Sequence, residues 1–200
     1  APINLNTWGY FDGQGHTISG LHIDNGDANY QALFSYIANS TISRLTVEGT
    51  VRGHQYVAGI VGLQDEESTT DRCVNHVKVI ATYGVAGGVV SHHNAWSATT
   101  SNCINLTTIT APSLAGGGVG GNGSKDNVSD NYGTHEYAIT GGQTLVTEEQ
   151  LRSGEVAWLL GEAFGQNLGT EPDAAVADTI PVIDGMKVFK VIYTTNSTAQ

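Results

Sequence analysis

Four residues, Gly59-Ile60-Val61-Gly62, return at a fixed interval along this chain of 200 residues. A related stretch follows 29 residues later, Gly88-Val89-Val90-Ser91, and another follows 29 residues after that, Gly117-Gly118-Val119-Gly120. A more divergent copy lies 27 residues before Gly59, at Ala32-Leu33-Phe34-Ser35. A fixed period of this length indicates a stacked repeat architecture. The sequence therefore predicts four related coils.

A second series of residues keeps nearly the same period. Its members are spaced by 28, 30 and 29 residues, and they are Leu45, Cys73, Cys103 and Tyr132. Apolar and polar residues alternate around them, which is the period of a half-buried strand. We expect these four residues to form one column along the stack. Cys73 and Cys103 should then be neighbours in adjacent coils, as reduced thiols in the core.

Short strands joined by Gly, Asn and Ser turns determine the expected fold. A unit of about 29 residues cannot close a core of its own, but stacked units pair every strand edge with a neighbour about 4.8 Å away. The sequence therefore predicts an all-β fold for residues 1–142, a right-handed parallel β-helix (β-solenoid) of about four coils.

Residues 143–200 lie outside the repeat and read as a capping segment. Thr147 and Gln150 have the spacing of a capping box, so a helix should begin there. Its apolar face would hold Leu151, Val156, Leu159 and Leu160, and Gly161 would end it. Residues 185–193 read as a terminal strand after an Asp184-Gly185 turn. We expect this α+β cap to pack on the last coil as one unit with the solenoid.

The charge of the chain excludes some partners. Nineteen acidic residues against eight basic ones give a formal charge of -11, which repels phosphate backbones and anionic membrane surfaces. The sequence thus predicts no nucleic-acid partner. It also predicts no membrane insertion in this segment, because no apolar run approaches the roughly 20 residues of a membrane span.

Part of the chain, about residues 11 to 140, resembles a known family. Residues 11–21, Phe-Asp-Gly-Gln-Gly-His-Thr-Ile-Ser-Gly-Leu, resemble the opening of GLUG-repeat regions, and residues 56–62 and 71–75 resemble the body of that repeat. The tail, in residues 151–160 and 164–170, resembles a segment that often follows such repeats. GLUG repeats occur in bacterial adhesin-like proteins and beside the protease domain of immunoglobulin A peptidases. The resemblance implies an extracellular or bacterial cell-surface location and further domains in the same chain.

The richest polar cluster is the turn after the strand at Gly88-Val89-Val90. It contains the candidate ligand-binding residues His92, His93, Asn94 and Trp96. Neighbouring histidines on an extended chain point to opposite faces, so these two should not chelate one metal together. An exposed Trp96 beside histidine and asparagine suits contact with a carbohydrate. The alternative is that Trp96 folds over the solenoid wall as a loop anchor.

No group of residues specifies catalysis. Asp65-Glu66-Glu67 lies among polar residues and reads as a solvated turn. His135-Glu136 lacks the second histidine of a zinc-protease helix. The resemblance to repeats of immunoglobulin A peptidases therefore does not imply peptidase activity for this chain. We therefore predict no catalytic residues, no cofactor and no metal.

The predicted function is that of a non-catalytic module of a surface or secreted protein. Such a module would act in adhesion, binding a host or environmental glycan or protein, or as a rigid spacer. The alternative is a glycan-cleaving β-helix enzyme, a polysaccharide lyase or glycosidase fragment, with its site in the turn at 91–96 or in further coils.

Overall fold

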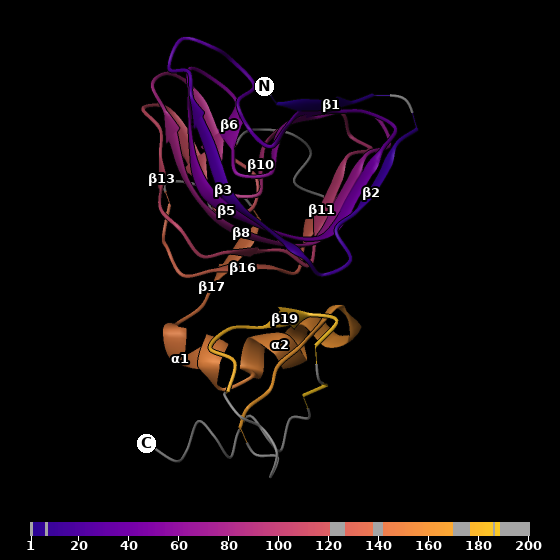
Figure 1. Ribbon diagram of the computed structural model, residues 1–200. Helices are drawn as coiled ribbons and strands as arrows, with labels where there is room; N and C mark the ends of the chain where they lie inside the picture. The colour runs from indigo at the N-terminus through magenta and orange to yellow at the C-terminus, as the bar shows by residue number, and fades with distance from the viewer. Residues whose placement is uncertain are drawn as a thin grey trace. The chain divides into compact units, whose positions relative to one another are not determined.

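The computed structural model describes residues 2–6, 8–120, 127–137, 142–169, 177–185 and 187–188. The chain divides into two compact units, Ala1–Leu145 and Val146–Gln200. The first unit consists of parallel strands stacked coil upon coil (Figure 1).

One sheet of the first unit carries the repeated Gly-Ile-Val-Gly motif. Its strands lie in the order β1 (Ile3–Leu5), β4 (Phe34–Ile37), β7 (Val61–Gln64) and β10 (Val90–His93). Phe34 pairs with Val61, Val61 pairs with Val90, and Val90 bridges to Val119. The register predicted from the motif spacing is therefore confirmed.

Two further sheets complete the coils. The larger contains β2 (Tyr10–Asp12), β3 (Thr17–Asp24), β5 (Thr41–Gly53), β8 (Thr69–Ala81), β11 (Thr99–Ser101), β12 (Ile104–Asn105), β13 (Ile109–Thr110), β15 (Val128–Ser129), β16 (Asn131–Gly133) and β17 (Gln143–Leu145). The smaller contains β6 (Val57–Ala58), β9 (Val85–Gly87) and β14 (Leu114–Gly116). Strand pairing in both sheets is parallel throughout the described part of the unit. The predicted β-solenoid of about four turns is thus confirmed.

The long strands β5 and β8 each contain an arginine with an unusual backbone conformation. Arg44 and Arg72 have φ angles of 52° and 51°, in the left-handed region that side chains rarely adopt. Residues at the equivalent place in two other coils, Asn102 and Asp130, have the same conformation, with φ angles of 52° and 53°. Because four coils repeat it, this corner is a property of the stack and not of a particular side chain.

The predicted column of Leu45, Cys73 and Cys103 forms, and all three side chains are buried. Leu45 pairs directly with Cys73, and the pairing of Ser101 with Asp71 and of Ile104 with Val74 puts Cys103 beside Cys73. Both cysteines are free thiols.

The place of Tyr132 in this column was predicted wrongly. Tyr132 pairs with Ile104, and Asn131 lies next to Cys103. Buried Asn131 accepts a hydrogen bond from the Cys103 backbone N–H at 2.9 Å and donates one to the Thr100 carbonyl oxygen at 3.0 Å. The asparagine thus occupies an interior place because the backbone of the adjacent coil satisfies its amide.

The second unit begins with the predicted capping box. Thr147 Oγ1 accepts from the Gln150 N–H at 3.1 Å, and Gln150 Oε1 accepts from the Thr147 N–H at 2.9 Å. Two helices follow instead of one, α1 (Glu148–Arg152) and α2 (Glu155–Leu160), because Gly154 between them is left-handed. Gly161 ends α2 as predicted.

The apolar face of this unit differs from the prediction at one residue. Leu151, Val156 and Leu160 are buried, whereas Leu159 is 45% exposed. The 3₁₀ turn η2 (Gly161–Ala163) leads into β18 (Phe164–Gly165), which pairs antiparallel with β19 (Val182–Ile183). Most of the strand expected over 185–193 falls outside the described residues. The packing of residues 143–200 on the last coil stays a prediction, although β17 itself pairs with β16 inside the first unit.

Candidate ligand-binding groove

The two histidines of the predicted turn end strand β10 and point to opposite faces, as expected. His93 is only 1% exposed and lies in the interior, with its Nε2 atom 2.8 Å from Thr100 Oγ1. His92 is half-buried on the outer face, and its ring centroid is 5.3 Å from that of Tyr56. His93 therefore packs in the core, and its role in ligand binding stays a prediction.

A second buried polar residue lies beside His93. Gln64, its register partner in the preceding coil, is also fully buried. Gln64 Nε2 donates to the carbonyl oxygens of Ser68 and Thr99 at 2.9 and 2.6 Å, and Gln64 Oε1 accepts from Thr70 Oγ1 at 2.9 Å. These bonds satisfy the Gln64 amide, so Gln64 is a structural element of the solenoid interior.

The other two residues of the predicted site lie at the surface. Trp96 is 79% exposed, which does not fit the alternative in which it packs over the wall as an anchor. Asn94 is exposed too, and its Nδ2 atom donates to Asp65 Oδ2 at 3.0 Å. The structure thus gives His92, His93, Asn94 and Trp96 different surroundings: His93 is in the core, His92 is half-buried, and Asn94 and Trp96 are exposed. Their joint role as a ligand site stays a prediction.

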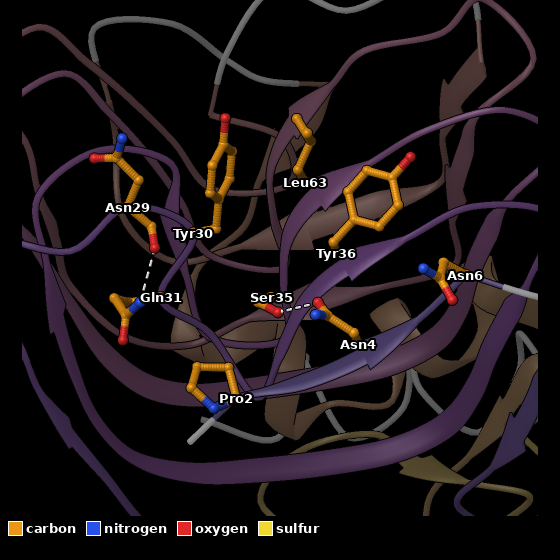
Figure 2. A pocket seen from close by; sticks show the side chains of 9 residues that line it. All are labelled: Pro2, Asn4, Asn6, Asn29, Tyr30, Gln31, Ser35, Tyr36 and Leu63. Atoms are coloured by element: carbon orange, nitrogen blue, oxygen red, sulfur yellow. Dashed lines mark hydrogen bonds between the residues drawn. The ribbon is translucent and has the colours of Figure 1, made fainter.

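A cavity of about 540 Å³ lies instead on the outer face of β1, β4 and β7, and we call it the groove. Figure 2 shows the rings of Tyr30 and Tyr36 on its two sides, with Leu63 between them. Uncharged side chains make up its entire lining: Pro2, Asn4, Asn6, Asn29, Tyr30, Gln31, Ser35, Tyr36 and Leu63.

Strand register builds one wall of the groove. Asn4 pairs with Tyr36, Tyr36 pairs with Leu63, and Leu63 pairs with His92, so one outward-facing column crosses the sheet. At the two ends of β4, Phe34 and Ile37 are buried in the core, whereas Ser35 and Tyr36 between them are only half-buried. Tyr36 therefore belongs to the outer surface of this sheet.

The loop between β3 and β4 builds the other wall. Tyr30 has a left-handed backbone (φ 58°), and its ring stacks on Tyr56 with centroids 5.2 Å apart and planes 6° from parallel. Gly62 lies beneath this loop. A Cβ atom there would lie 2.7 Å from the Ser35 carbonyl oxygen and 3.2 Å from the Tyr30 backbone. The glycine of the repeated motif thus allows the loop to approach the sheet.

Hydrogen bonds hold the second tyrosine of the groove. Tyr36 donates its hydroxyl proton to Asp65 Oδ2 at 3.2 Å, and Asp65 also accepts from Asn94. Burial, together with the charge of Asp65, raises the pKa of Tyr36, so its hydroxyl stays protonated and remains a donor. Asn94 therefore supports the groove indirectly, through Asp65.

Sequence reasoning missed the groove residues, although one signal was available. Tyr30 lies two residues before one copy of the motif, and Tyr56 lies three residues before the next copy. Tyrosines at nearly equivalent places in adjacent coils are expected to stack, and they do.

The three acidic residues of the turn at 65–67 have different surroundings. Glu66 and Glu67 are exposed, and Asp65 is engaged by Tyr36 and Asn94. Within the described ranges, no three or more His, Cys, Asp or Glu side chains gather closely enough to hold a metal ion. No helix in the described part of the chain is both long and apolar enough to cross a membrane.

The fold and the groove define a β-solenoid protein with a ligand-sized concavity on one sheet. Comparisons with family models, curated proteins and solved structures found no match for the chain. The resemblance to GLUG repeats stays a prediction.

Proposed function

We propose that this chain is a non-catalytic module of a bacterial surface or secreted protein, and that it acts in adhesion by binding a ligand. The groove carries the proposal. Its volume of about 540 Å³ lies within the range of about 300 to 1,000 Å³ typical of ligand sites, and its lining combines aromatic with hydrogen-bonding side chains. The resemblance to GLUG repeats supports the surface location.

The composition of the groove favours binding over cleavage. Glycoside hydrolysis commonly needs a pair of carboxyl groups facing the scissile bond. The groove lining contains no carboxyl group, and the nearest acid described above, Asp65, accepts hydrogen bonds from Tyr36 and Asn94. This arrangement supports a binding module over the alternative of a glycan-cleaving enzyme.

The proposal is tested with the whole chain on arrays of glycans and of extracellular host proteins. The same polysaccharides are incubated with the chain and assayed for new reducing or unsaturated ends. We expect binding without cleavage. New chain ends would instead identify an enzyme, and the absence of binding on every array would leave only the role of a spacer.

A further inference from the structure

We propose that the groove binds an uncharged oligosaccharide, with one sugar unit held between Tyr30 and Tyr36. This inference rests on the proposed function, to which it adds a location and a ligand class. Three features of the groove support it: hydrogen bonds orient the side-chain amides, neighbouring residues hold the tyrosine rings in place, and the lining has no charged side chain.

The amides of the groove are oriented by the protein itself. Ser35 Oγ donates to Asn4 Oδ1 at 2.5 Å (Figure 2), and His54 Nδ1 lies 2.9 Å from Asn29 Oδ1. Because the oxygen of each amide is engaged by a neighbouring side chain, Asn4 and Asn29 present their NH₂ groups as donors. Sugar hydroxyl and ring oxygens are suitable acceptors for such fixed donors.

The aromatic rings are supported from behind. Tyr56 covers one face of the Tyr30 ring, and Tyr30 as a whole remains 38% exposed. The hydrogen bond from Tyr36 to Asp65 fixes the second ring. A pyranose ring has apolar C–H faces and polar edges, so it can pack a face on a tyrosine while its hydroxyl groups reach the amides.

Charge decides between neutral and ionic ligands. The chain has a formal charge of -11, which disfavours acidic glycans, and no cation in the lining would compensate for it. A cationic ligand would need an acceptor carboxylate, which the lining also lacks. A neutral ligand loses no ionic hydration on entering such a site, so it is the class that the lining fits.

The test titrates the whole chain with neutral hexasaccharides built from glucose, mannose or N-acetylglucosamine, and with hexagalacturonate as the acidic counterpart. Isothermal calorimetry measures the wild type, Tyr30→Ala, Tyr36→Ala and Tyr36→Phe. Trp96→Ala is the matched control, because it removes an exposed aromatic side chain that does not line the groove.

We expect the wild type to bind at least one neutral hexasaccharide. Either alanine variant should bind about ten-fold more weakly or worse, since a ring contact is lost. Tyr36→Phe should show a smaller loss, because it keeps the ring but not the bond to Asp65. Trp96→Ala should bind like the wild type, and affinity should change little between about 0.05 and 0.5 M salt because no ion pair forms.

Other outcomes overturn the inference. Unchanged binding by both alanine variants, or a loss confined to Trp96→Ala, would remove the ligand from the groove while leaving the proposed function intact. Binding of hexagalacturonate alone would overturn the neutral class. No binding of any hexasaccharide by the wild type would overturn the inference, and the array result then decides the proposed function separately. Circular dichroism checks that each variant folds; if Tyr36→Ala does not, Tyr30→Ala and Tyr36→Phe carry the test.

Discussion

The side-chain amide of Asn75 donates to the side-chain oxygen of Asn105 in the next coil, at 2.8 Å. Both residues are buried, and they are register partners of β8 and β12. The Oδ1 atom of Asn75 also accepts from the Val77 N–H at 3.1 Å. The core of the solenoid therefore contains a satisfied polar ladder that links adjacent coils.

Replacing Asn75 by alanine should destabilise the fold. The change leaves the Asn105 oxygen and the Val77 N–H buried without these partners, at a cost of about 1 to 3 kcal/mol for each. Urea denaturation followed by circular dichroism measures the free energy of unfolding. Exposed Asn25 supplies the control, since Asn25→Ala should change that free energy by less than about 0.5 kcal/mol. Equal stability of the two variants would show that the ladder contributes nothing.

The glycine that opens the repeated motif makes room for this ladder. A Cβ atom on Gly59 would overlap the side-chain oxygen of Asn75. Gly59→Ala should therefore destabilise the protein by about 1 to 3 kcal/mol, as overpacking does. In the double variant with Asn75→Ala the main overlap disappears, so the combined loss should be smaller than the sum of the single losses. Strict additivity in the urea data would argue against this coupling.

These contacts explain why so much of the fold could be read from the sequence. Gly59 lies against Asn75, and Gly88 lies against Asn105. In these two coils the glycine of the motif and the asparagine depend on each other, so the period is visible in the sequence. The sequence could not predict that Asn131, and not Tyr132, lies beside Cys103. An asparagine is typical of turns, and its place in the interior depends on a backbone carbonyl oxygen of the adjacent coil that accepts its hydrogen bond. Apart from the recurrence of Tyr30 and Tyr56, the groove could not be predicted, for a similar reason. It depends on three coils bringing Asn4, Tyr36 and Leu63 into one column, and on a loop that is locally unremarkable.

The two cysteines should be unreactive in the folded protein. Burial raises the pKa of the Cys103 thiol well above its usual range, and the neighbouring Cys73 adds to the effect. The Cys103 thiolate is therefore scarce, and burial of both cysteines in the core keeps reagents away from their sulfur atoms. We expect Ellman's reagent to modify neither thiol in the native protein and both in concentrated guanidinium. Rapid modification of one thiol under native conditions would contradict the buried column.

Acidification should weaken the fold before the carboxyl groups titrate. Burial lowers the pKa of His92 and of His76 below 6.5; at His76 the charge of Glu48 partly opposes the shift. The unfolded chain consequently binds more protons than the folded one below pH 6.5. This part of the stability is complete above that pH, and it is lost as the pH falls from 6.5 toward the lower folded-state values.

The measurement is the free energy of unfolding of the wild type and of a His76→Gln, His92→Gln double variant across this range. The double variant should show a flatter pH dependence. An identical slope in both proteins would mean that other groups cause the acid sensitivity.

The corner at Arg44, Arg72, Asn102 and Asp130 keeps one backbone conformation although three residue types occupy it. The stacking of the coils therefore determines the backbone conformation at this edge, while the residue type can vary. The edge amounts to a row of substitutable sites with the pitch of stacked strands, about 4.8 Å. A pattern of charges or reactive groups could be written along it at that pitch, one per coil, without redesigning the interior.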